Sequence, residues 1–186
     1  MVEADLKLVE AGDWDPDDAE AFGRMYEEHF VRVYNYIRYR VGDAATTDDL
    51  TSVTFHKALD HRFEFDPRRA KISTWLLTIA RNTVHDHHRS RSRRLNLLVH
   101  WWRGRTVTQP DPETILIGDE ERDGLLAALW QLPDRDRDLL GLKFGAGHTN
   151  REIAATTGLS ESNVGVVVHR ALGKLRGLLE AERKMP

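Results

Sequence analysis

Residues 149–176 read TNREIAATTGLSESNVGVVVHRALGKLR, and this stretch predicts two helices joined by a tight turn. Thr149 and Glu152 have the spacing of a capping box, which starts the first helix. Gly158 supplies the turn, and Val164 packs the second helix onto the first. The stretch is therefore typical of a helix-turn-helix, in which the second helix enters the major groove of DNA.

The second helix of this motif has an inward and an outward face. Ser160 can cap its start. Apolar residues recur at steps of three and four and predict an inward stripe of Val164, Val168, Ala171, Leu175 and Leu178. The residues left to face a DNA groove or backbone are Asn163, Val166, His169, Arg170 and Lys174. An ordinary helical hairpin with a solvated basic face is the alternative, because a lone helix-turn-helix pattern is not specific.

Apolar residues recur at helical spacing through almost the whole chain, and no stretch alternates as a half-buried strand does. One helix ends before Gly42, a second runs over residues 47–60, and a third begins near Ser73. Further on, a helix stops at Pro133, and Asp134 can cap the helix that follows it. We therefore expect an all-α protein.

Residues 95–118 interrupt this periodicity. They contain glycine and prolines, so we expect an extended linker between two small helical domains. The expected organisation is an acidic N-terminal tail over residues 1–21, a first domain over 22–94, the linker over 95–118 and a second domain over 119–182. For the tail, a disordered solubilising segment is favoured over an internal shield for a basic DNA-binding face.

Charge is distributed unevenly along the 186 residues, although the formal net charge is only -3. Residues 1–28 carry ten acidic and two basic side chains, whereas residues 61–94 carry nine basic and three acidic ones. The first segment repels phosphate and the second attracts it. Basic residues also gather at helix C-termini for electrostatic reasons, so a solvated helix end is the alternative for the second segment.

Composition excludes several other classes of protein. The chain has no cysteine, which removes disulfides and thiolate zinc sites, and no carboxylates converge on His85 and His88, so we expect no metal and no cofactor. No apolar run approaches the ~20 residues of a membrane span, and the acidic start is unlike a signal peptide. We therefore expect a soluble, cytoplasmic protein without membrane insertion. The absence of a converging catalytic cluster and of a phosphate-binding glycine loop argues against an enzyme.

Three segments together carry a family resemblance. Residues 74–82 read TWLLTIARN, residues 48–55 read DDLTSVTF, and Leu132–Pro133 is followed by Arg135 and Arg137. In identity, order and spacing these segments resemble those of the extracytoplasmic-function (ECF) sigma factors of RNA polymerase.

The resemblance covers residues 22–94, as the family's region 2, and residues 119–180, as its region 4. It implies a protein that binds core RNA polymerase through the beta-prime and beta subunits and directs recognition and melting of promoter DNA. The residues implied for polymerase binding are Asp48, Asp49, Ser52 and His56. Those implied for the minus-ten element are Lys71, Arg81, Asn82, His85 and Arg89. Those implied for the minus-thirty-five element are Arg151, Asn163, Val166, His169, Arg170 and Lys174.

Some points stay open under this resemblance. Phe63 and Phe65 either stack on separated bases or belong to the core, and the core is favoured. Residues 165–167 are Gly-Val-Val where relatives commonly carry cations, so we expect weaker or different upstream recognition. Most relatives have an anti-sigma partner, which makes such a protein a candidate partner here. The alternative function is a helix-turn-helix regulator that binds duplex DNA without polymerase, although residues 22–94 would have no role in it.

Overall fold

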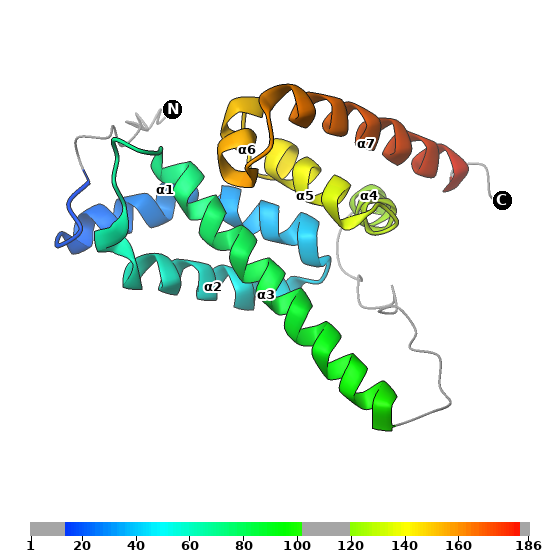
Figure 1. Cartoon of the computed structure of the whole chain (residues 1–186), viewed down its shortest axis with the longest axis horizontal. Coiled ribbons are helices and arrows are strands. Elements are labelled where there is room, and N and C mark those ends of the chain that lie inside the picture. Colours follow the sequence, from blue (N-terminus) through cyan, green and yellow to red (C-terminus); the bar gives the residue numbers. More distant parts are fainter. Residues whose placement is uncertain (1–13, 102–119, 183–186) are drawn as a thin grey trace.

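The computed structural model describes residues 14–101 and 120–182, with side chains over 14–91 and 124–181. All regular structure in these residues is helical, which confirms the expected all-α class (Figure 1). The helices are α1 (Ala19–Val41), α2 (Ala44–Asp60), η1 (Arg62–Glu64), α3 (Ile72–Trp101), α4 (Glu120–Trp130), α5 (Asp134–Leu140), η3 (Gly141–Gly145), α6 (Asn150–Thr157) and α7 (Glu161–Glu182). Residues 1–13 of the expected tail and 102–118 of the expected linker lie outside the described residues.

Local sequence sets the ends of the first two helices. The Asp18 side chain caps α1 by accepting a backbone hydrogen bond at 2.8 Å. As expected, α1 ends before Gly42, whose φ of 80° is a conformation that favours glycine. α2 begins at Ala44, earlier than expected, because the Asp43 carboxylate caps it through a 2.7 Å bond from the Thr46 N–H.

α3 is longer than the sequence pattern predicted. It continues to Trp101, which places residues 95–101 in a helix rather than in the expected linker. No glycine or proline occurs between Ile72 and Trp101, so nothing in that stretch stops the helix. Apolar periodicity, which was used to place the linker, reports on packing, whereas helix formation here needs only the propensity of the residues. In Figure 1 the end of α3 extends away from the other helices.

The segment before α1 packs on the first domain from Trp14 onward. The Trp14 ring lies edge-on to the ring of Phe65, with the ring centroids 5.7 Å apart. The Arg62 Nε donates a hydrogen bond to the Pro16 carbonyl oxygen at 2.8 Å. The expectation of a disordered tail is therefore wrong for residues 14–21, because an aromatic ring anchors their start to the core.

The two phenylalanines near η1 have different environments. Phe65 is buried beside Trp75, with ring centroids 5.2 Å apart, which confirms it as a core residue. Phe63 is 57% exposed, and the Arg62 guanidinium lies 4.3 Å from its ring centroid. The expectation that Phe63 belongs to the core is wrong, because its ring lies on the surface under a cation instead.

The two helical domains pack directly against each other. α1 contacts α5 and η3, and α3 contacts α6; in Figure 1 the helices α4–α7 lie along one side of α1–α3. Ile37 of α1 belongs to the same buried cluster as Leu139 and Leu142. The backbones approach closely, since a Cβ atom at Gly145 would lie 3.1 Å from the Asn35 carbonyl oxygen. The sequence predicted two domains and a linker, but not this shared core.

Candidate nucleic-acid and polymerase interface

α6 and α7 form the expected helix-turn-helix. In the capping box, the Thr149 N–H donates to a Glu152 carboxylate oxygen at 2.9 Å, and the Glu152 N–H donates to the Thr149 hydroxyl at 3.2 Å. Gly158 ends α6 in the left-handed conformation, with a φ of 76°. Val164 of α7 is fully buried. The motif is therefore built from the residues that predicted it.

α7 has the two faces that its sequence predicts. Its start is capped as expected, because the Ser160 hydroxyl accepts a hydrogen bond from the Asn163 N–H at 3.3 Å. The inward stripe is buried or half-buried and comprises Val164, Val168, Ala171, Leu175 and Leu178. All six candidates on α6 and α7 are exposed: Arg151, Asn163, Val166, His169, Arg170 and Lys174. On α7, the spacing of Asn163, Val166 and Arg170 puts hydrogen-bonding and cationic groups on one face with the half-exposed Val166.

Lys174, the last candidate on α7, is engaged within the second domain. Its Nζ lies 2.6 Å from a carboxylate oxygen of Asp136, a residue of α5 that is almost fully buried. The pair ties α7 to α5. Lys174 therefore has a structural partner in addition to any role toward DNA.

The candidates for polymerase binding all lie on the surface of α2. Asp48, Asp49, Ser52 and His56 are exposed. The Ser52 hydroxyl donates to the Asp48 carbonyl oxygen at 3.0 Å, and the His56 ring lies 3.2 Å from the Asp60 carboxylate. Val53 on the same helix is also exposed. The surface thus combines two acidic groups with one exposed apolar side chain, a mixture that is compatible with an interface.

The minus-ten candidates on and before α3 fall into two groups. Asn82 and Arg89 are exposed. Lys71, Arg81 and His85 instead face the second domain. The Lys71 Nζ lies 2.9 Å from a Glu152 carboxylate oxygen, and the Arg81 Nε donates to Asp138 at 2.8 Å. Two of the cations expected to contact the minus-ten element are therefore paired with carboxylates of the second domain.

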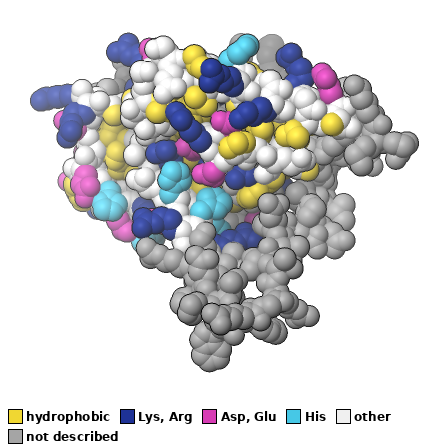
Figure 2. Space-filling view, turned by 45° about the vertical axis from the view of Figure 1, so that its right-hand side comes forward, with side chains coloured by type: hydrophobic (Ala, Val, Ile, Leu, Met, Phe, Trp, Pro, Cys, Tyr) yellow, Lys and Arg dark blue, Asp and Glu magenta, His cyan; other side chains and the backbone are white. Residues whose placement is uncertain are grey.

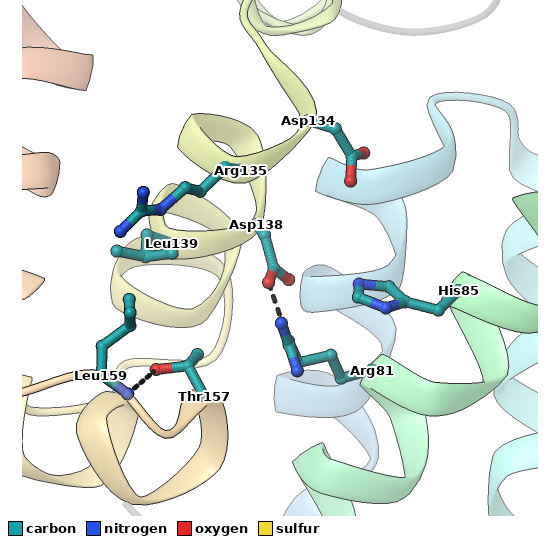
Figure 3. A pocket seen from close by; sticks show the side chains of 8 residues that line it. All are labelled: Arg81, His85, Asp134, Arg135, Asp138, Leu139, Thr157 and Leu159. Atoms are coloured by element: carbon teal, nitrogen blue, oxygen red, sulfur yellow. Dashed lines mark hydrogen bonds and ion pairs between the residues drawn. The ribbon is translucent and has the colours of Figure 1, made fainter.

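A pocket of about 240 Å³ separates part of α3 from α5 (Figure 3). Arg81 and His85 line it from α3, and Asp134, Arg135 and Asp138 line it from α5. Figure 2 shows that Lys and Arg side chains on one face of the molecule are interspersed with Asp and Glu. The cations at this boundary are partly neutralised by the chain's own acids.

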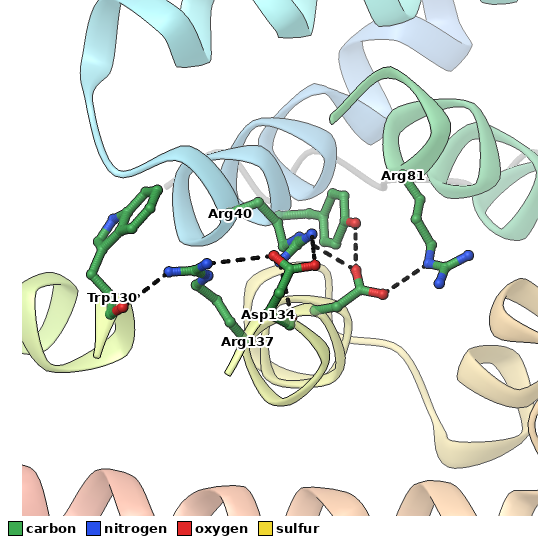
Figure 4. A network of polar contacts seen from close by, with 7 residues as sticks. Arg40, Arg81, Trp130, Asp134 and Arg137 are labelled. Carbon is green, nitrogen blue, oxygen red and sulfur yellow. Dashed lines mark hydrogen bonds and ion pairs between the residues drawn. The ribbon is translucent and has the colours of Figure 1, made fainter. Parts of the chain in front are cut away.

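Behind this pocket lies a buried polar network that links α1 to α5 (Figure 4). The Arg40 side chain is 0% exposed, and its Nη atoms donate to the two carboxylate oxygens of Asp134 at 2.7 and 3.2 Å. The Arg40 Nε lies 3.4 Å from Asp138, to which the Tyr36 hydroxyl donates at 2.7 Å. With Arg81, Asp138 thus meets two cations and a phenol. This network fixes α5 against α1.

The network also explains why Asp134 does not cap α5. Pro133 occupies the cap position, and no side chain caps that helix. The prediction for Asp134 is wrong, because its carboxylate binds Arg40 instead. Burial opposes ionisation, but the hydrogen bond and charge of Arg40, together with the charge of Arg137, outweigh it and lower the pKa of Asp134 to about 2.

Sequence reasoning missed the residues that join the two domains. Besides Tyr36 and Arg40, these include Trp130, whose indole lies against Gly42. The guanidinium carbon of Arg137 lies over the same indole, 4.2 Å from the ring centroid. The sequence did contain a signal for Arg40, because this residue lies three positions after Ile37 and therefore on the apolar face of α1. A charged residue on an apolar helical face needs a buried partner.

Within the residues that the structure describes, no group of three or more His, Cys, Asp or Glu side chains could hold a metal ion. None of the described helices has the length and apolar character to cross a bilayer.

Comparison with protein families identifies both halves of the chain. Residues 25–94 match Sigma-70 region 2, and residues 128–177 match Sigma-70 region 4. The ECF RNA polymerase sigma factor BldN of Streptomyces coelicolor is 35% identical over 174 residues, which cover 94% of this chain and 65% of BldN. The ECF RNA polymerase sigma factor SigX of Bacillus subtilis is 29% identical over 169 residues, 89% of this chain and 87% of SigX.

A solved structure agrees with these matches. CnrH, in complex with the cytosolic domain of CnrY, superposes with a TM-score of 0.65 at 28% identity and covers 89% of this chain and 91% of that chain. The fold and the matches define a protein with sigma-70 regions 2 and 4. The chain belongs to the ECF RNA polymerase sigma factors, a non-enzymatic family that directs RNA polymerase in promoter recognition and transcription initiation. The resemblance stated from the sequence is confirmed.

The buried network gives a first prediction. Arg40→Ala should lower the free energy of unfolding by about 3–5 kcal/mol, because it leaves two carboxylates at the domain boundary without their buried cation. Urea denaturation followed by circular dichroism measures the change. Arg24→Ala is the control, since its exposed pair with Asp18 at 3.5 Å should contribute less than about 1 kcal/mol. Equal losses in the two variants would contradict this role of Arg40.

His88, beside the same network, gives a second prediction. Burial, reinforced by the charge of Arg40 and opposed by that of Asp134, lowers the pKa of His88 from 6.5 to about 4. A lowered histidine pKa favours the neutral folded form, so stability should fall as pH decreases from about 6.5 toward about 4. In thermal melts across this pH range, His88→Gln should make the melting temperature depend less on pH. An unchanged pH slope in the variant would show that His88 does not contribute.

Proposed function

We propose that this chain recruits core RNA polymerase to promoters through three separate surfaces. The outer face of α2 binds polymerase, α3 binds the minus-ten element, and the α6–α7 motif binds the minus-thirty-five element. The observation that carries the proposal is that one chain presents all three surfaces, each with exposed groups of suitable chemistry. A helix-turn-helix regulator that acts without polymerase would need only the last of them.

The polymerase surface would use Asp48, Asp49, Ser52 and His56. All four are exposed on α2, and their net negative charge suits a basic partner surface. Val53 adds an exposed apolar contact. We assign this surface to the beta-prime subunit, with the beta subunit contacting other parts of the chain.

The minus-ten surface would combine a base contact with phosphate contacts. The Asn82 amide is exposed and can both donate to and accept from a base edge. Arg89 is exposed about two helical turns further along the same face of α3 and can neutralise phosphate. Lys71, Arg81 and His85 would join them once they leave the second domain. The exposed ring of Phe63 offers a stacking surface for an unpaired base.

The minus-thirty-five surface would read duplex DNA with few direct base contacts. Asn163 can bond to a base edge, and the Val166 methyl groups can touch thymine. Arg151, His169 and Arg170 would supply most of the affinity through the backbone. Lys174 would contribute only if it released Asp136. The absence of cations at residues 165–167 is consistent with weak selection for guanine.

We further propose an anti-sigma partner and a cytoplasmic location. CnrH was solved bound to the cytosolic domain of CnrY, which makes a protein of that kind a candidate regulator here. The polymerase that this chain would serve is cytoplasmic, and no described helix could hold the chain in a membrane.

The function is tested by transcription in vitro. The purified chain, added to core RNA polymerase and a random promoter library, should create a discrete set of start sites. Asp49→Lys should weaken core binding about tenfold, because it reverses a charge on the proposed polymerase surface. Asp17→Lys, an equal charge change at an exposed position before α1, is the control. The proposal fails if the wild-type chain neither binds core enzyme nor changes where RNA synthesis begins.

Asn82 gives a separate test of base recognition. Asn82→Ala should change which minus-ten sequences are selected from the library, since it removes a hydrogen-bonding amide but no charge. Arg89→Ala should instead reduce transcription from all promoters by similar factors, because phosphate contacts carry no sequence information. Start-site sequencing separates the two effects. A uniform loss with Asn82→Ala would rule out its assignment as a base contact.

A further inference from the structure

A short segment before α1 packs on the loop that joins α2 to α3. We name this segment, residues 14–16, the N-terminal strap; it lies ahead of residues 25–94, the part of the chain that matches region 2. In Figure 1 the start of the described chain lies beside that loop. The strap therefore gives the loop contacts from outside the matched region.

Local hydrogen bonds fix one end of the strap. The Asp15 carboxylate accepts from the Asp17 N–H at 2.9 Å, and the Asp15 carbonyl oxygen accepts from the Asp18 N–H at 3.2 Å. An aspartate that bonds to the backbone two residues on is typical of a turn. This turn leads directly into α1, because Asp18 is the residue that caps that helix.

Aromatic contacts fix the other end of the strap. The Trp14 ring lies edge-on to Phe65 and to Trp75, with ring centroids 5.7 and 6.4 Å apart. Its indole N–H is buried and has no hydrogen-bond partner among the described residues. Packing rather than hydrogen bonding therefore holds this ring, and it must outweigh the cost of a buried unpaired donor.

Between these two ends, the strap orients the side chain of Arg62. The Arg62 Nε donates to the Pro16 carbonyl oxygen at 2.8 Å, and its Nη1 donates to the Leu59 carbonyl oxygen at 2.8 Å. Because a guanidinium is planar, two bonds to separate carbonyl groups set its orientation. Its carbon atom lies 4.3 Å from the centroid of the Phe63 ring. The strap thus holds a cation against one face of that ring.

The Phe63 ring has the properties of a stacking platform. It is 57% exposed although the guanidinium lies over one face, so much of the remaining surface faces solvent. Proteins that bind separated strands stack successive bases on such rings and hold the backbone with nearby cations. Arg68 and Arg69 are exposed on the same loop and can supply those cations.

We propose that the N-terminal strap is a positioning element for promoter melting: through Arg62, it holds the Phe63 ring in the orientation that receives one unpaired base of the minus-ten element. The strap itself makes no contact with DNA in this role. It orders the platform before the base arrives, so less conformational entropy is lost when the base stacks. This inference rests on the proposed function, because the base belongs to the element that the chain would open.

Removal of single bases measures the stacking contact. The probe is a fork DNA that carries a minus-ten sequence selected in the library experiment, unpaired over that element, with one base at a time replaced by an abasic site. The affinity of each fork is measured for the full chain bound to core polymerase. In the wild type, loss of the captured base should weaken binding about tenfold. With Phe63→Ala, the intact and abasic forks should bind alike.

Two variants test the positioning role. Trp14→Ala removes the aromatic anchor of the strap. Arg62→Lys keeps the charge but lacks the planar group that reaches two carbonyl oxygens. Both should reduce the tenfold effect at the same DNA position to about threefold or less, because the ring is no longer ordered before stacking. Binding of the fork that already lacks this base should stay close to wild type.

Arg69→Ala is the matched control. It removes an exposed cation from the same loop and leaves the strap intact. It should weaken the intact and abasic forks by the same factor, since a phosphate contact does not depend on the base. Circular dichroism checks that each variant is folded. If Trp14→Ala does not fold, Arg62→Lys carries the test alone.

The results separate a positioning role from a structural one. The proposal is supported if the folded strap variants and Phe63→Ala lose the effect of the same base while Arg69→Ala keeps it. It is overturned if no base effect depends on Phe63, if a folded strap variant keeps the tenfold effect, or if the strap variants weaken all forks equally. Specific starts by the wild-type chain together with any of these results would reject only the role of the strap. Absence of specific starts would reject the proposed function and this inference with it.

Discussion

The guanidinium of Arg40 sets the relative placement of the two domains. It emerges from an apolar face of α1 and is fully buried, so it must find its counter-charges inside the protein. Asp134 and Asp138 supply them from α5, and the Tyr36 hydroxyl donates a further hydrogen bond to Asp138. Because these bonds are directional, α5 has one favourable register against α1, whereas apolar packing alone would tolerate several.

This placement has unequal effects on the chain's surfaces. The outer faces of α2 and α7 stay open to solvent, so the surfaces proposed for polymerase and for upstream duplex are accessible in this arrangement. The α3 surface is divided, since Asn82 and Arg89 are open while Arg81 is engaged by Asp138. A sigma factor must bind polymerase and DNA together, and domain packing can therefore affect one step without blocking the other.

Features that depend on neighbouring residues were predictable from the sequence. The helix-turn-helix follows from the capping box of Thr149 and Glu152 and from the turn at Gly158, all within a short segment. Features that depend on distant partners were not predictable. Asp134 fits a cap by local rules, yet it binds a residue far away in sequence, and Lys71 and Arg81 were placed toward DNA before their acidic partners were known. The local pattern of apolar and capping residues determines where the helices form, whereas the contacts between helices depend on three-dimensional packing.

The length of α3 also affects how far the two domains can move apart. As helix, the seven residues 95–101 advance the chain by about 10 Å, whereas in extended form they would span about 25 Å. The tether between the domains therefore loses about 15 Å of maximum reach. A shorter tether keeps a released domain close to its former partner and raises the local concentration for rebinding. The helical end of α3 thus limits the distance between the two domains more than an extended linker of the same residues would.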